Sequence, residues 1–167
     1  MDKQALLGSR AYFDMVHGVT LRAIGALANE DLDFRPKPGM RSPRELIYHI
    51  YAFEGALVDA TLNGRFTPEV EKSSNPETEE GKAAIAELNT VAALQQFARD
   101  CHQAVGDALA TLTDEQIQGP VEASYGSFPA WQFFQFAYDE HWHHRGQLYT
   151  YLRLLGKEPP MLYDYEH

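Results

Sequence analysis

The chain has 167 residues, of which 44% are hydrophobic and 23% charged, a composition that is ordinary for one soluble globular domain over residues 1–167. Its formal net charge of −10 argues against nucleic acid and anionic membranes as partners, because both are bound by basic protein faces. The apolar runs are far shorter than the roughly 20 residues that span a bilayer. The one cysteine, Cys101, cannot form a disulfide within the chain, so we expect a cytoplasmic protein.

Four segments show the apolar spacing of long amphipathic helices. They cover residues 5–28, 43–63, 91–112 and 128–155. The second segment has the clearest start, because Ser42 is a good cap residue, Pro43 takes the first helical position and Glu45 completes a capping box. Gly64, directly after this segment, is a typical helix end.

The connections between these segments differ in length. Residues 66–86 form a long, polar and acidic crossover, in which we expect one short helical turn near residues 83–88. Residues 113–126 form another connector, and we expect no strand there or elsewhere in the chain. The sequence therefore predicts an all-α protein, a four-helix bundle whose long crossover allows the second and third helices to run parallel.

The last predicted helix carries a carboxylate and a histidine on its apolar face. Glu140 and His144 are four residues apart and therefore share one face. The rest of that face is apolar or aromatic and consists of Phe133, Ala137, Leu148, Tyr151 and Leu155. Burying an unpaired carboxylate is costly, so Glu140 needs a partner. His49, on the inner face of the second helix, lies at a similar depth, and a divalent metal held by His49, Glu140 and His144 would explain all three residues.

A hydrogen-bonded pair of Glu140 and His144, buried for packing alone, explains the same spacing, and spacing does not separate the two interpretations. The neighbouring histidines lie off this face. His141 is on its flank, while His143 is on the polar side, as a surface residue or a hydrogen-bond neighbour of the site. Glu54 is a candidate acceptor for the second ring nitrogen of a ligand histidine.

Two segments resemble the DinB family: Ser-Pro-Arg-Glu-Leu-Ile-Tyr-His-Ile at residues 42–50 and His-His-Arg-Gly-Gln-Leu at residues 143–148. The resemblance extends over essentially the whole chain in its helix order. It implies an up-down-down-up bundle, commonly dimeric, with a divalent metal in a pocket of the bundle interior. The usual ligands of that family are three histidines, one in the second helix and two spaced by four residues in the last.

His49 and His144 match two of these three positions. Glu140 stands at the third, which gives a set similar to that of the related mycothiol-dependent maleylpyruvate isomerases. His141, the next residue, is the alternative third ligand. The face that Glu140 shares with His144 favours Glu140.

Two histidines and a carboxylate leave coordination positions open to water or substrate, which is typical of catalytic sites. The resemblance implies a metal-dependent enzyme, a thiol S-transferase or a hydrolase, with zinc as the first choice of metal and nickel, iron or manganese as alternatives. Its partners would be a small-molecule substrate, a low-molecular-weight thiol and a second copy of the chain. The competing hypothesis is a metal-bound, stress-induced binding protein without turnover, which a closed and fully packed site would favour.

Overall fold

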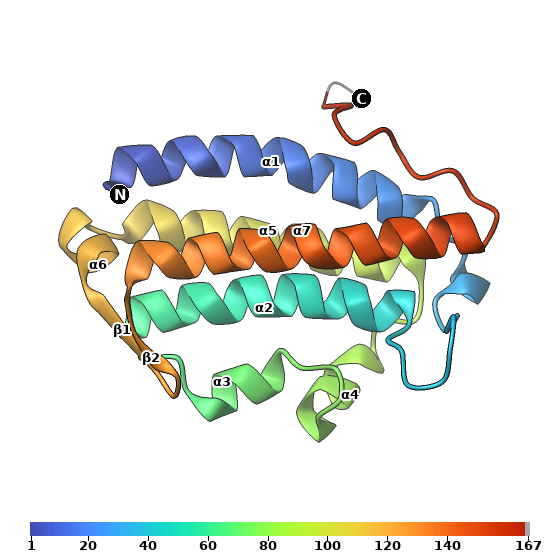
Figure 1. Ribbon diagram of the computed structural model, residues 1–167, viewed down its shortest axis with the longest axis horizontal. Coiled ribbons are helices and arrows are strands. Elements are labelled where there is room, and N and C mark those ends of the chain that lie inside the picture. The colour runs from blue at the N-terminus through green and yellow to red at the C-terminus, as the bar shows by residue number, and fades with distance from the viewer. Residues whose placement is uncertain (166–167) are drawn as a thin grey trace.

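The computed structural model describes residues 1–165, and most of these residues are helical (Figure 1). The long helices are α1 (Lys3–Gly25), α2 (Pro43–Asn63), α5 (Val91–Thr111) and α7 (Ala130–Leu154). They pack side by side, since α2 contacts α5 and α7, and α1 contacts the same two helices. In Figure 1, α1 and α7 run in one direction while α2 and α5 run in the other. The predicted all-α architecture is confirmed.

The start of α2 follows the predicted capping box. The backbone N–H of Ser42 donates to Glu45 Oε2 at 2.7 Å, and the backbone N–H of Glu45 donates to Ser42 Oγ at 3.3 Å. Gly64 ends the helix with a φ of 66°, a left-handed conformation that glycine adopts without steric cost. These two ends fix the phase of α2, and with it the direction in which His49 points.

The crossover between α2 and α5 contains more structure than expected. Its helices are α3 (Pro68–Ser73) and α4 (Glu79–Ile85), whereas the sequence predicted one turn near residues 83–88. Threonine side chains cap both helices: Thr67 accepts from the backbone of Val70, and Thr78 from that of Gly81. The crossover packs against α2, where the Tyr48 hydroxyl donates to a backbone carbonyl of α3.

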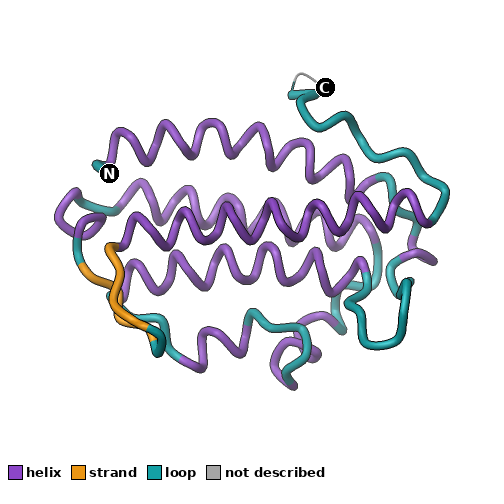
Figure 2. Tube along the Cα trace, viewed as in Figure 1, coloured by secondary structure: helices purple, strands orange, loops and turns teal. Residues whose placement is uncertain are grey.

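The prediction that residues 113–126 contain no strand is wrong. After the short helix α6 (Asp114–Gln118), the strands β1 (Pro120–Ala123) and β2 (Gly126–Pro129) form an antiparallel hairpin. Each strand is too short to show an alternating pattern in the sequence. Tertiary contacts stabilise the hairpin instead: Val121 is fully buried, and the backbone of Glu122 bonds to both Gly64 and Phe66. Figure 2 shows the hairpin across one end of the long helices.

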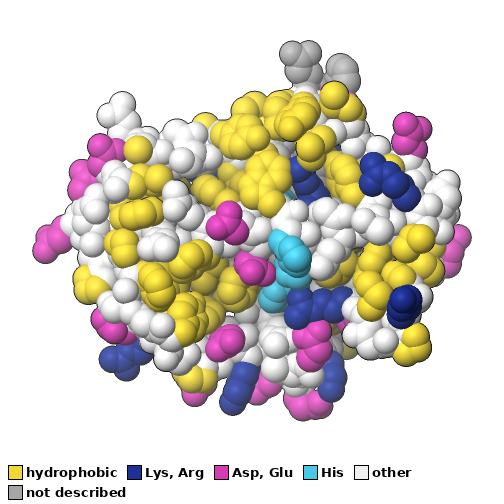
Figure 3. Space-filling view, in the orientation of Figure 1, with side chains coloured by type: hydrophobic (Ala, Val, Ile, Leu, Met, Phe, Trp, Pro, Cys, Tyr) yellow, Lys and Arg dark blue, Asp and Glu magenta, His cyan; other side chains and the backbone are white. Residues whose placement is uncertain are grey.

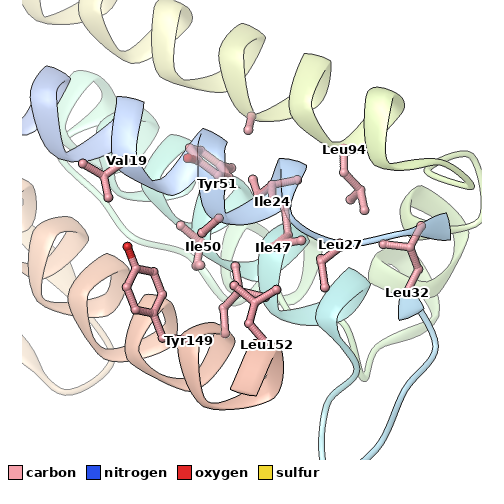
Figure 4. Close-up of a cluster of buried hydrophobic side chains, with 13 residues drawn as sticks. Val19, Ile24, Leu27, Leu32, Ile47, Ile50, Tyr51, Leu94, Tyr149 and Leu152 are labelled. Carbon is pink, nitrogen blue, oxygen red and sulfur yellow. The ribbon is translucent and has the colours of Figure 1, made fainter. Parts of the chain in front are cut away.

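The hydrophobic core joins all four long helices. One cluster, shown in Figure 4, is built from α1, α2, α5, α7 and the loop after α1. Its labelled members are Val19, Ile24, Leu27, Leu32, Ile47, Ile50, Tyr51, Leu94, Tyr149 and Leu152. Full burial of one such aliphatic side chain contributes about 1.5–3 kcal/mol, so this cluster is a main source of the free energy of folding. Every described helix is too short or too polar to serve as a membrane span.

Candidate metal centre

The three predicted ligands come together between the adjacent helices α2 and α7. His49, Glu140 and His144 each offer one ligand atom, and these atoms all lie within 4.8 Å of one another. Glu140 Oε2 is 3.1 Å from His144 Nε2 and 3.6 Å from His49 Nε2. The two imidazole rings are nearly perpendicular, at 84°, so that their Nε2 atoms converge on the carboxylate from two directions. We call these three residues the His–Glu–His centre.

The remote nitrogen of each histidine is held by a hydrogen bond. His49 Nδ1 donates to the backbone carbonyl of Ser74 at 2.8 Å, and His144 Nδ1 donates to Gln147 Oε1 at 2.9 Å. A ring nitrogen that donates in this way leaves Nε2 as the atom that faces the carboxylate. Both side chains are therefore oriented and placed in the tautomer that metal ligation through Nε2 requires.

Glu140 is ionised and lies at the edge of the bundle. Its side chain is 40% exposed, whereas its place on the apolar face of the helix predicts a buried carboxylate. The hydrogen bond with His144, followed by the close approach of His49, holds the pKa of Glu140 far below its ordinary value. A carboxylate that faces two ring nitrogens requires a positive group between them, either a proton or a metal cation. The centre therefore has a donor set of two imidazole nitrogens and a carboxylate oxygen, which fits a divalent metal such as zinc.

His141, the alternative third ligand, lies on another side of α7. It is fully buried, and its Nε2 is 2.7 Å from Thr20 Oγ1 on α1. Its ring packs edge-on against Phe13, with ring centroids 4.8 Å apart. His141 faces a different side of α7 from Glu140, because consecutive residues differ by about 100° around a helix. The structure brings His49 and His144 together with Glu140 and places His141 apart from them.

The assignment of Glu54 as an acceptor for a ligand histidine is wrong. Five residues after His49, its side chain is rotated by about 140° around α2 and faces α1 and α5. Glu54 Oε1 lies 3.2 Å from Arg10 NH1 and 3.3 Å from His102 Nδ1. The acceptor for His49 is the carbonyl of Ser74, a backbone group that no sequence pattern identifies.

His143 is exposed, as expected, and reaches the centre through one intermediate side chain. Its Nε2 accepts a hydrogen bond of 3.1 Å from Gln147 Nε2, and Gln147 in turn accepts from His144. The sequence pattern did not identify Gln147 as part of the site. Its position three residues after His144, on the same face of the helix, was the signal that could have identified it.

Two cavities lie on either side of the centre. One has a volume of about 260 Å³, and its lining residues are Met40, Arg41, His144, Gln147 and Tyr151. The other has a volume of about 360 Å³, and its lining residues are Phe53, Leu57, Tyr125, Phe136, Asp139 and Glu140. On this face, Figure 3 shows histidine side chains beside acidic ones, with a hydrophobic area to one side. The centre is therefore accessible from the surface.

These features define a mostly helical protein with a possible metal site between two of its long helices. The sequence model of the DinB superfamily matches residues 12–148, and the chain belongs to that superfamily, as the resemblance implied. A DinB-like protein of Bacillus subtilis, YjoA, has a similar structure, with a TM-score of 0.71 and 21% sequence identity over 92% of this chain and 96% of that chain. At this identity the likeness shows a common fold. No curated protein matches the sequence significantly.

Proposed function

We propose that the protein is a metal-dependent enzyme, built as an up-down-down-up four-helix bundle, in which His49, Glu140 and His144 bind one divalent metal ion. The observation that carries this proposal is the convergence of two Nε2 atoms on an ionised carboxylate, while both Nδ1 atoms donate elsewhere. Zinc is the metal that we propose first, with nickel, iron or manganese as alternatives, since imidazole and carboxylate ligands accept all of them.

The chemistry that we propose is the transfer of a low-molecular-weight thiol to a small electrophile. When bound, the metal would act as a Lewis acid and lower the pKa of a thiol or of water. The three protein ligands would leave coordination positions open, and Glu140 would neutralise part of the metal charge. Ser74 and Gln147 keep the imidazoles in place, so little reorganisation accompanies binding of a reactant.

The two cavities support a reaction with two reactants, because each cavity borders a different proposed ligand. In a thiol transfer, the thiol loses its proton, its sulfur forms a bond to an electrophilic atom, and a leaving group departs with the electrons of the bond that breaks. In hydrolysis, the alternative, water takes the place of the thiol. The exposed edge of Glu140 supports either reaction over a closed site without turnover.

We also propose that two copies of the chain associate. Large apolar side chains are exposed on α1, at the end of α7 and on the C-terminal segment; they are Tyr12, Met15, Leu154, Met161, Leu162 and Tyr163. Contiguous exposed apolar groups commonly mark a contact surface, and here the rings of Tyr12 and Tyr163 both contact that of Tyr165, which joins α1 to the C-terminal segment. Light scattering should then give twice the mass of the 18.9 kDa chain, and a monomer mass at micromolar concentration would contradict the dimer.

The open metal site can be tested by loading tag-free protein with cobalt, whose absorption reports its ligands. We expect about one ion per chain and, on addition of 2-mercaptoethanol, a new sulfur-to-metal charge-transfer band. The His144→Ala variant, treated identically, should show neither. Binding of the ion without any response to the thiol would favour a closed site, and absence of cobalt and zinc uptake would refute the metal centre.

A further inference from the structure

The larger of the two cavities is lined mainly by apolar and aromatic side chains. Among its lining residues, Leu57 is fully buried, while Phe53 and Phe136 are partly buried. Tyr125 is 57% exposed at its outer edge. Glu140 lines the same cavity, which therefore borders the His–Glu–His centre. We call the cavity the aromatic hollow.

Contacts between rings link the aromatic hollow to both the hairpin and the centre. On one side, the ring of Phe128 lies 5.8 Å from that of Tyr125 and 5.7 Å from that of Phe136. On the other side, the ring of Phe53 lies 5.3 Å from the imidazole of His49. Aromatic pairs at such distances stabilise one another, so the walls are preorganised. Tyr125 belongs to the turn of the hairpin, which the backbone of Glu122 attaches to the end of α2.

The smaller cavity has a different character. Arg41 lies in its wall, paired with Glu77 through two hydrogen bonds of 2.7 Å and 3.0 Å. The Tyr151 hydroxyl donates to the backbone carbonyl of Arg41 at 2.9 Å. The aromatic hollow offers an apolar group more apolar surface and three aromatic rings, those of Phe53, Tyr125 and Phe136. The charged groups that line the aromatic hollow are the carboxylates of Asp139 and Glu140, which disfavour an anionic substituent there.

We infer, on the basis of the proposed function, that the electrophilic substrate carries an uncharged apolar group about the size of a benzene ring, which packs against Phe53, Tyr125 and Phe136. Its reacting atom then faces the His–Glu–His centre. The volume of about 360 Å³ lies at the lower end of the range of small-molecule sites and suits such a group. Tyr125 comes from the hairpin rather than from a long helix. It therefore contributes to the preference for an apolar group but does not hold the metal.

Two hydroxamates provide the test, since the hydroxamate group chelates divalent metals. Acetohydroxamate has a methyl group beside the chelating group, whereas 3-phenylpropanohydroxamate adds a phenyl ring on a short linker. In calorimetric titrations of the zinc-loaded protein, we expect the phenyl compound to bind at least about tenfold more tightly, because its ring leaves water for an apolar surface. A carboxylate on the phenyl ring should remove this gain.

The Tyr125→Ala variant should reduce the advantage of the phenyl compound to less than about threefold and leave acetohydroxamate affinity unchanged. Tyr163→Ala is the matched control, since Tyr163 is 64% exposed on the C-terminal segment and should leave the advantage intact. Equal binding of the two hydroxamates to the parent protein would overturn the inference while the metal centre stands. Failure of both compounds to bind would overturn the open metal centre and the inference together.

Discussion

Two groups of histidines and carboxylates lie in this helical bundle, and their surroundings differ. One is the His–Glu–His centre between α2 and α7, which borders two cavities. The other lies among α1, α2 and α5 and consists of the buried residues Arg10, Glu54 and His102 together with Asp14, whose side chain is 54% exposed; we call it the buried ion cluster. Similar residue types thus occur in both groups. The groups differ in the cation that their carboxylates face.

In the buried ion cluster the protein supplies the cation. The Arg10 guanidinium lies 2.8 Å from Asp14 Oδ1 and 3.2 Å from Glu54 Oε1. It also donates to the backbone carbonyl of His102 at 2.6 Å, and the His102 ring contacts both carboxylates. The charge of the buried carboxylate is therefore balanced by a cation that belongs to the folded structure.

In the His–Glu–His centre, the partners of the carboxylate are two imidazoles. Glu140 lies at hydrogen-bond distance from His144 and close to His49, and both rings already use their other nitrogen. The comparison teaches that histidine and carboxylate content alone does not distinguish a structural cluster from a binding site. The distinction depends on whether an arginine or lysine supplies the cation. Where neither does, a place for an external cation remains.

The largest effect should come from breaking the buried ion cluster. Arg10→Met leaves Glu54 buried and uncompensated, since the Glu54 side chain is 1% exposed. We expect the free energy of unfolding to fall by about 3–5 kcal/mol in urea titrations. Replacing both partners, with Arg10→Met and Glu54→Leu, should recover part of this loss. Lys82→Met, which removes the exposed pair with Glu79, is the control and should leave the stability nearly unchanged.

Removing a ligand residue should affect the His–Glu–His centre and leave the buried ion cluster intact. In His144→Ala and His49→Ala, we expect zinc affinity to fall by more than about 100-fold, because loss of a residue that merely orients a ligand already costs about 10- to 100-fold. His143→Ala should bind zinc like the parent protein, since His143 is exposed, its ring meets that of His144 only edge-on, and its Nε2 bonds to Gln147. An equal loss of affinity in all three variants would refute the assignment.

A change of charge at Glu140 tests whether Glu140 or His141 is the third ligand. Glu140→Gln removes the negative charge at nearly constant shape, and we expect zinc affinity to fall by about tenfold or more, roughly 1.4 kcal/mol upward. Glu140→His should restore binding, because it rebuilds a site of three histidines. His141→Ala should leave the affinity nearly unchanged, since His141 bonds to Thr20. Loss of zinc binding in His141→Ala, with Glu140→Gln tolerated, would reverse the assignment.

The sequence could predict those features that depend on local spacing. The capping box at Ser42 sets the start of α2, and a spacing of four residues places Glu140 and His144 on one face of α7. The same reasoning selected His49 as the histidine that reaches them from the neighbouring helix. The superfamily follows from these segments as well.

Other features depend on how elements pack and could not be read from spacing. The acceptor of His49 is the carbonyl of Ser74, whose position follows from the path of the crossover. Glu54 was assigned to the wrong group because the faces of α2 that meet α1, α5 and α7 are not distinguishable by residue type. The hairpin that carries Tyr125 is stabilised by contacts with α2, so its two short strands have little sequence signal of their own.

The smallest effect that we predict is the response to acid of His17, which stacks on His102 of the buried ion cluster, with ring centroids 3.8 Å apart. Burial, followed by the charges of His102 and Arg10, lowers the pKa of His17 to about 3. In the unfolded chain the pKa returns to about 6.5. Below pH 6.5 the unfolded chain therefore binds a proton that the folded protein does not, so the free energy of unfolding falls as the pH falls toward 3.

Between pH 6.5 and 5.5 this single histidine should remove about 1 kcal/mol of stability, measured by urea titration of metal-free protein. His17→Gln removes the titrating group while its amide can still bond to the Tyr51 hydroxyl, which lies 2.8 Å from His17 Nδ1. Its stability should therefore decline less over that interval. His143→Gln, which removes an exposed histidine, should retain the pH dependence of the parent. If His17→Gln loses as much stability as the parent between pH 6.5 and 5.5, the acid sensitivity does not originate from His17.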